Sequence, residues 1–143
     1  MTVKAIIDAK GGDVVTIEPT ANLATAAKLL AQRRIGALVV LGADQRIVGI
    51  LSERDIVRMI SERGAAAFDD QVGQVMTRKV ATCTYDETIH SIMERMTAGK
   101  FRHVPVIELG RLAGIISIGD VVKNRIQEME QESAAMRDYI QTA

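Results

Sequence analysis

The chain has 143 residues, enough for one compact domain or two small packed halves, and its 18 basic residues balance 18 acidic ones. A neutral chain has no broad positive field, which argues against binding to nucleic acid or to an anionic membrane surface. Apolar residues make up 48% of the sequence and aromatic residues 3%, so we expect a core of aliphatic side chains.

The few cysteines and histidines limit the metal and redox chemistry open to the chain. Cys83 is the single cysteine, so no intrachain disulfide can form. Because the chain has only two histidines, His90 and His103, we also expect no metal site. The acidic residue Asp8 lies too close to the N-terminus for this segment to be a secretory signal. No segment is long and apolar enough to span a bilayer. We therefore expect a cytoplasmic protein that does not contact membranes.

An internal repeat organises the sequence. Residues 14–17 align with residues 80–83 at an offset of 66, and residues 49–57 align with residues 114–122 at an offset of 65. The offset changes within residues 42–45, which are typical of a turn, where an insertion costs little. The sequence therefore predicts two copies of one βαββα unit, an α/β (α+β) fold.

The predicted elements come in the same order in both copies. Short, nearly all-apolar runs joined by turn residues predict strands whose sheets are covered on both faces, and apolar residues at positions i, i+3, i+4 and i+7 predict helices. In the first copy, these are a lead-in helix at 3–10, a strand at 14–17, a helix from Leu23, strands at 37–41 and 47–51, and a helix after Ser52. In the second, they are a strand at 80–82, a helix from Ile89, strands at 103–107 and 112–116, and a helix after Ser117.

These elements divide the chain into five segments. The segments are a lead-in helix (1–12), repeat 1 (13–62), a connector (63–78), repeat 2 (79–125) and a C-terminal helix (126–143). In the last helix, residues 122, 126, 129, 133, 136 and 140 form a heptad-like seam with one polar member, Ser133. This seam predicts either packing on the helix's own domain or contact with a second chain.

The repeated motif Gly-Ile-(Leu/Ile)-Ser-x-x-Asp is the feature that points most clearly to function. Ser52 and Asp55 in one copy match Ser117 and Asp120 in the other. Taken singly, each pair is typical of a helix cap. Two copies, each placed where a strand enters a helix, present backbone N–H groups, a hydroxyl and a carboxylate to one cleft. A carboxylate can accept hydrogen bonds from both hydroxyls of a ribose.

Residues 13–125 resemble a tandem pair of CBS domains, a regulatory unit also called a Bateman module. The residues that carry the resemblance are 49–55, 114–120, 102–106 and 75–77. The resemblance implies repeats related by a pseudo-twofold axis, with two clefts that hold adenosine-containing ligands and no metal. AMP is the ligand expected first, with ADP, ATP, NAD(H) or S-adenosylmethionine as alternatives. It also implies that two chains pair into a flat disc.

Carried over residue by residue, the resemblance implies a nucleotide site in each cleft. Asp55 and Asp120 would bind ribose, with Ser52 and Ser117 beside them. Backbone groups near Thr16 and Thr82 would meet the adenine edge, and the base would be walled by Ala37, Leu38, His103, Val104 and Pro105. The cations expected near phosphate are Arg54, Arg78, Lys79, Arg102 and His103. Solvated side chains remain the alternative for Arg54 and for the linker pair Arg78-Lys79, and a purely structural role remains for His103.

The two copies differ where phosphate would lie, because Gly36 and Ala37 align with Arg102 and His103. We therefore expect two unequal adenosine sites in a regulatory sensor that acts on a separate protein partner. A ligand-free scaffold for dimerisation or protein interaction is the main alternative. A nucleotide-processing enzyme is disfavoured because neither copy contains a nucleophile–base pair or a Gly-x-x-x-x-Gly-Lys loop, so we expect no catalytic residues.

Overall fold

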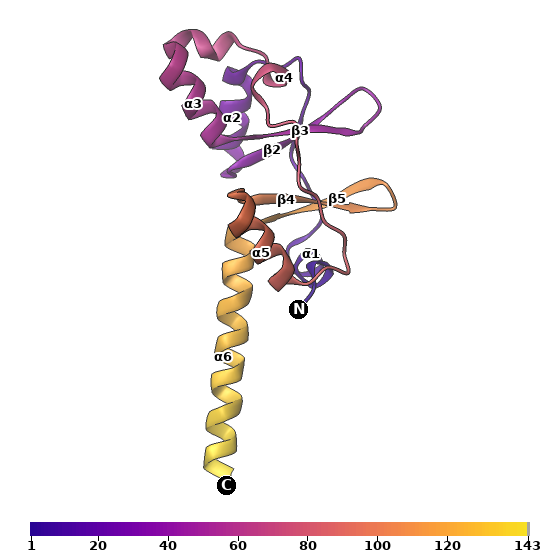
Figure 1. Ribbon diagram of the computed structural model, residues 1–143, viewed down its shortest axis with the longest axis vertical. Helices are drawn as coiled ribbons and strands as arrows, with labels where there is room; N and C mark the ends of the chain where they lie inside the picture. Colours follow the sequence, from indigo (N-terminus) through magenta and orange to yellow (C-terminus); the bar gives the residue numbers. More distant parts are fainter. Residues whose placement is uncertain (143) are drawn as a thin grey trace.

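The computed structural model describes residues 1–142 and contains two small sheets, each covered by helices. Figure 1 shows the two sheets stacked one above the other, with their hairpin turns pointing to the same side. The last helix leaves this body and extends well beyond it. Residue 143, the end of the predicted C-terminal helix, lies outside the described residues.

The first half of the chain forms a three-stranded sheet in the order β1-β2-β3. β1 runs parallel to β2, and β2 pairs antiparallel with β3, so that Ala37 lies opposite Ser52. The elements are α1 (Val3–Lys10), β1 (Thr16–Ile17), α2 (Leu23–Arg33), β2 (Ala37–Leu41), β3 (Ile47–Ser52), α3 (Glu53–Arg63), the 3-10 helix η1 (Gly64–Asp69) and α4 (Val72–Val75).

The second half repeats this arrangement with a two-stranded sheet. β4 and β5 pair antiparallel, and His103 lies opposite Ser117 just as Ala37 lies opposite Ser52. Leu109 and Gly110 both have positive φ, of 51° and 76°, which gives the tight turn that joins these strands. The elements are α5 (Ile89–Gly99), β4 (His103–Glu108), β5 (Arg111–Ser117) and α6 (Ile118–Thr142).

The strand predicted at residues 80–82 is absent from the described chain, and this prediction was wrong. A single parallel bridge joins Cys83 to Val106, at the place equivalent to the Ile17–Val40 pair of the first sheet. Side chains take the backbone groups on either side of this bridge. The Arg95 guanidinium donates to the Thr82 carbonyl at 2.7 Å, and the Thr84 N–H donates to the Glu87 carboxylate at 2.7 Å. These groups flank Cys83 and point away from β4, so they do not limit the ladder. In the first sheet Val39 N–H donates to the Val15 carbonyl, but its equivalent in β4 is Pro105, which has no N–H, and the ladder therefore stops at Cys83.

Each half has its own aliphatic core, as the composition predicts. Leu23, Leu38 and Leu51 are fully buried in the first core, and Ile92, Val104 and Ile116 in the second. The lead-in helix α1 belongs to the second core, because Val3, Ile6 and Ile7 pack there. The segment between the repeats belongs instead to the first core, through Val72, Val75 and Met76. Each core is therefore completed by a segment from outside its own repeat. The helix that precedes the first repeat packs in the second core, and the connector that precedes the second repeat packs in the first core.

The C-terminal helix α6 does not pack its heptad-like seam on its own domain. Val121 and Asn124 are its buried residues, whereas the seam residues Val122, Ile126 and Met129 are about half exposed. The first of the two alternatives that the sequence left open is therefore wrong. The apolar seam of this helix faces away from the single chain over the described residues.

Candidate functional site

Both Ser-x-x-Asp motifs form helix caps with nearly the same geometry. At the start of α3, Ser52 N–H donates to Asp55 Oδ2 at 2.9 Å, and Asp55 N–H donates to Ser52 Oγ at 3.3 Å. At the start of α6, the Ser117 N–H bond to Asp120 Oδ2 is also 2.9 Å. The capping role is therefore present at both sites. It fixes each carboxylate at the end of a strand and leaves Oδ1 outside the cap.

A cleft of about 360 Å³ lies next to the first cap and is shared by the two repeats. It brings together seven of the residues predicted from sequence. These are Ala37, Ser52, Arg54, Asp55, Lys79, Arg102 and His103. Residues of the first repeat supply the carboxylate and the hydroxyl, whereas residues of the second repeat form the facing wall. The site is therefore not contained within one copy of the repeat.

The cleft carries a local excess of positive charge, although the chain as a whole is neutral. Its acidic lining residues are Glu53 and Asp55. Its cationic lining residues are Arg54, Arg58, Lys79, Lys100 and Arg102. The Arg58 guanidinium lies 3.3 Å from Asp55 Oδ1, so part of this charge is paired with the buried carboxylate. The remaining cations can attract an anionic ligand.

The second carboxylate has a different partner. Lys10 Nζ, at the end of α1, donates to Asp120 Oδ2 at 2.7 Å and to the Ile115 carbonyl at 2.9 Å. Burial raises the pKa of Asp120, but the bonds from Lys10 and Ser117 outweigh it and hold the pKa below its usual value. Asp120 Oδ2 therefore accepts from Lys10 Nζ, Ser117 N–H and Ser117 Oγ together.

His103 lies between the two repeats. An alanine side chain at Gly36 would come within 3.2 Å of the imidazole, so the glycine permits this close approach. Burial lowers the pKa of His103, and the carboxylates of Glu53 and Asp120 act in the opposite direction without cancelling the effect. The imidazole is therefore neutral at pH 7 and does not supply a positive charge to a phosphate.

Other predicted site residues lie outside this cleft. Leu38 and Val104 are fully buried in the first and second cores. Side chains alternate between the two faces of a strand. Because Ala37 and His103 line the cleft, the next residues, Leu38 and Val104, point away from it. Pro105 is buried on β4 and its carbonyl accepts from Cys83 N–H. Arg78 turns back to the Gly73 carbonyl at 3.0 Å, in keeping with the linker interpretation.

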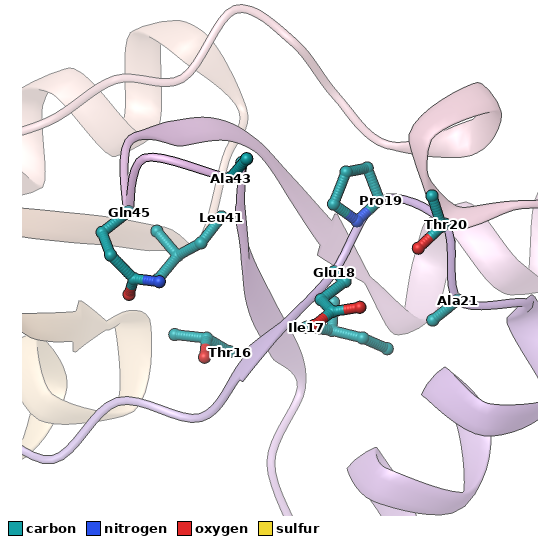
Figure 2. A pocket seen from close by; sticks show the side chains of 10 residues that line it. Thr16, Ile17, Glu18, Pro19, Thr20, Ala21, Leu41, Ala43 and Gln45 are labelled. Atoms are coloured by element: carbon teal, nitrogen blue, oxygen red, sulfur yellow. The ribbon is translucent and has the colours of Figure 1, made fainter.

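Thr16 and Thr82 are also separated from the cleft. Thr16 lines a larger hollow of about 700 Å³ at the hairpin end of the first sheet, together with Glu18, Leu41 and Gln45 (Figure 2). Among the described residues that line this hollow, Glu18 is the one with a charge, which does not suit an anionic ligand. The Thr82 carbonyl is taken by Arg95.

Several cleft residues were missed by the sequence interpretation. Lys100 ends α5 in the left-handed conformation with φ of 57°, and Arg34 ends α2 in the same way with φ of 54°. These two positions align in the repeat, so the repeat contained a signal for Lys100. The sequence contained no signal for the contact of Lys10 with Asp120, because 110 residues separate them. Thr77, Val80 and Ala81 line the cleft where Thr82 was expected.

The chemistry available to the described residues fits binding. Burial, and after it Glu87, raises the pKa of the Cys83 thiol to about 12, so Cys83 is protonated at neutral pH and is a poor nucleophile. Over residues 1–142, no group of three or more His, Cys, Asp or Glu side chains could hold a metal ion. Within the same residues, no helix is both long and apolar enough to cross a bilayer.

Comparison with known families identifies the fold. The family model of the CBS domain matches residues 3–62 and 72–126, which is most of the chain. The chain therefore belongs to the CBS-domain family, as a pair of CBS repeats. The first matched segment includes the lead-in helix α1 as well as the first repeat.

Among solved structures, a CBS-domain-containing protein from Agrobacterium tumefaciens is 50% identical, with a TM-score of 0.85 over 87% of this chain and 92% of that one. The CBS domain protein PAE2072 from Pyrobaculum aerophilum, complexed with AMP, is 28% identical, with a TM-score of 0.75 over 84% and 89% of the two chains. A pair of CBS repeats similar to this chain therefore binds AMP.

The mitochondrial CBS domain-containing protein CBSX3 from Arabidopsis thaliana is 38% identical over 120 residues. The match covers 81% of this chain and 58% of the Arabidopsis protein, so this chain spans a little over half of that relative's length. That relative is assigned to a compartment other than the cytoplasm expected from the sequence.

Proposed function

We propose that this chain is a regulatory sensor that binds an adenine nucleotide in the cleft beside Asp55. One observation carries the proposal. A buried carboxylate at a helix start lies in the same cleft as five cationic residues, and the cleft is built from both repeats. A carboxylate suits the hydroxyls of a ribose, and the surrounding cations suit a phosphate. The AMP complex of the Pyrobaculum relative supports this ligand class.

The lining residues suggest how the ligand lies. Asp55 Oδ1 and the Ser52 hydroxyl would bond the ribose at the start of α3. The ribose would there replace the exposed Arg58 guanidinium, which lies 3.3 Å from Asp55 Oδ1. Val80 and Ala81 line the cleft and their backbone groups would meet the adenine edge. Lys100 and Arg102 face this motif from the second repeat and would hold the phosphate.

The second site, beside Asp120, would bind more weakly. Both carboxylates have a cationic partner, but Arg58 is 57% exposed and lies 3.3 Å from Asp55, whereas Lys10 is 33% exposed and lies 2.7 Å from Asp120. A ribose would therefore displace Lys10 less easily than Arg58. We propose AMP as the ligand of the first cleft, and a different affinity or a different adenosine ligand, such as NAD(H), ATP, ADP or S-adenosylmethionine, for the second. The sensor would act on a protein partner, and ligand binding would shift the balance between states that the partner distinguishes.

Thermal unfolding with separate nucleotides tests this proposal. AMP at a hundred times its dissociation constant should stabilise the chain by about 2.7 kcal/mol. Asp55→Ala should remove most of this effect, whereas Asp120→Ala should leave the tighter site in place. Asp69→Ala, an exposed carboxylate outside the cleft, is the matched control. If AMP, ADP, ATP, NAD(H) and S-adenosylmethionine all leave the melting temperature unchanged, the sensor proposal fails and a scaffold role replaces it. Turnover of a nucleotide would instead establish an enzyme.

A further inference from the structure

The C-terminal helix α6 has two faces with different surroundings. Val121 on one face belongs to the second core, Asn124 contacts Met1, and Glu128 lies 3.6 Å from the amino group of Met1. The opposite face is apolar and exposed. Its residues are Val122, Ile126, Met129, Met136 and Ile140, with exposed fractions of 49%, 50%, 54%, 59% and 66%. Figure 1 shows that most of this helix extends past the body of the chain.

The exposed residues follow the heptad pattern of a coiled coil. Ile126, Ser133 and Ile140 fall on a positions, and Val122, Met129 and Met136 fall on d positions. Apolar a and d residues form the seam between paired helices. The residues that pack on the body of the chain, Val121 and Asn124, fall on c and f positions, which face away from such a seam. Domain packing and helix pairing are therefore compatible.

We propose that the same helix of a second copy covers this seam, in a parallel and in-register coiled coil. The charges that flank the seam determine the direction. In a parallel pair, each g residue faces the e residue of the next heptad on the other helix. Arg125 of one chain then meets Glu130 of the other, and Glu132 meets Arg137. Both contacts join opposite charges, and twofold symmetry forms each of them twice.

An antiparallel pair over the same length brings like charges together. Glu130 would face Glu130 of the other helix, Glu132 would face Glu132, and Lys123 would face Arg137. Arg125 bonds Glu128 of its own helix at 3.3 Å, but this side chain is half exposed and such pairs contribute little. It can therefore turn to the other helix when the seam closes.

This assembly goes beyond the proposed nucleotide site and does not depend on it. A parallel coil starts at the second repeat of each chain, so it brings the two second repeats together. The nucleotide cleft beside Asp55 lies between the repeats and away from the seam. Ligand binding and pairing can therefore be measured separately on the same variants.

Charge exchange on the full chain tests the direction of pairing. Sedimentation analysis should show a dimer for the natural sequence and a dissociation constant about tenfold higher for Glu130→Lys, because two attractive contacts become repulsive. Adding Arg125→Glu should restore pairing to within about threefold. Gln131→Lys, on the opposite face, is the matched control and should leave pairing unchanged. A chain that stays monomeric, or a dimer indifferent to these exchanges, overturns the proposal.

Disulfide trapping gives an independent measure of register. In a parallel in-register pair, position 133 of one helix faces position 133 of the other, so Ser133→Cys should cross-link rapidly in oxidised glutathione. Gln131→Cys should not cross-link, and buried Cys83 sets the background. A cross-link that forms only when Ser133→Cys is mixed with Met129→Cys shows antiparallel pairing and overturns the proposal. AMP affinity should be the same in all these variants. Failure of the natural chain to bind AMP would contradict the nucleotide site and leave the pairing proposal intact, whereas loss of binding only in the seam variants would contradict the independence of the two.

Discussion

Asp55 and Asp120 occupy equivalent positions in the repeat and make equivalent caps, yet their ionic partners differ. Arg58, one turn along the same helix, pairs with Asp55. Lys10, from a distant helix, pairs with Asp120. Arg58 is an exposed side chain with a single contact to the carboxylate, whereas Lys10 is also anchored by the Ile115 carbonyl. The difference between the two carboxylates therefore comes from single side chains rather than from the motif.

Lys10→Ala should change the second site in two ways. Removing the ammonium frees a hydrogen-bonding position on Asp120 Oδ2, so affinity for uncharged adenosine at this site should rise about threefold, the equivalent of ~0.6 kcal/mol for a partly exposed ion pair. AMP should gain less, because its phosphate loses a nearby cation. Calorimetric titration of both ligands checks this expectation. Lys4→Ala, which breaks the exposed pair with Asp8 on the same helix, is the control. An unchanged adenosine affinity would show that Lys10 does not obstruct the site.

His103 should make stability depend on pH in a defined window. Its folded pKa lies below the ordinary value of 6.5, so the neutral imidazole is stabilising above pH 6.5. As pH falls through 6.5 towards the lower folded pKa, the unfolded chain binds more protons and the free energy of unfolding decreases. His103→Gln should flatten this part of the profile in denaturant titrations. His90→Gln, at an exposed position on α5, should leave it unchanged. Asp120 acts in a separate window, below its ordinary value of 3.8.

Among single elements, β3 contains Gly49, which allows the connector between the repeats to lie against the sheet. Ile50 and Thr77 exchange backbone hydrogen bonds at 2.9 and 3.0 Å, which holds the connector beside β3. A side chain at Gly49 would come within 2.5 Å of Met76 Sδ and 2.9 Å of the Thr77 carbonyl. Thr77 also lines the cleft beside Asp55, so this contact positions part of the candidate site.

Gly49→Ala should therefore destabilise the chain by about 1–3 kcal/mol, because the new methyl group forces the connector away from the sheet. Gly119→Ala provides a matched comparison on α6, where the nearest atom to a new side chain is Ser117 Oγ at 3.6 Å. Alanine favours a helix over glycine, so this variant should be neutral or stabilised by up to about 1 kcal/mol. Urea titration measures both. Equal destabilisation of the two variants would contradict the close packing at Gly49.

At the scale of the whole molecule, the two repeats exchange supporting segments. The lead-in helix α1 completes the core of the second repeat, and α4 completes the core of the first. The contact between Lys10 and Asp120 follows from this placement, because α1 ends beside β5 and the start of α6. Neither core is complete without a segment outside its own βαββα unit.

Ile7→Ala should therefore weaken the second repeat although it lies at the other end of the sequence. The loss of a buried side chain should cost about 2–5 kcal/mol, and hydrogen exchange in β4 and β5 should accelerate. Asp8→Ala, exposed on the same helix, should have little effect. Faster exchange confined to α1 would show that the helix is an accessory to the second core and not part of it.

Much of the local structure could be predicted from the sequence. Of the six predicted strands, four formed within one residue of their predicted bounds, at 37–41, 47–52, 103–108 and 111–117. The strand predicted at 14–17 is shortened to Thr16–Ile17. The opening strand of the second copy failed because Pro105 has no N–H to donate, whereas its equivalent Val39 donates to the Val15 carbonyl in the first sheet. The cleft was predicted in part, since strand alternation sends Leu38 and Val104 into the cores.

The sequence by itself determined the repeat, the two helix caps and the seam of the last helix, because each depends on residues close together in the chain or on their periodicity. Only the tertiary structure decided that one cleft is shared by both repeats, that Lys10 bonds Asp120, and that the seam is exposed. These features join residues far apart in sequence, and their contacts exist only once the strands and helices have packed. Periodicity predicts which face is apolar, but packing decides what covers that face.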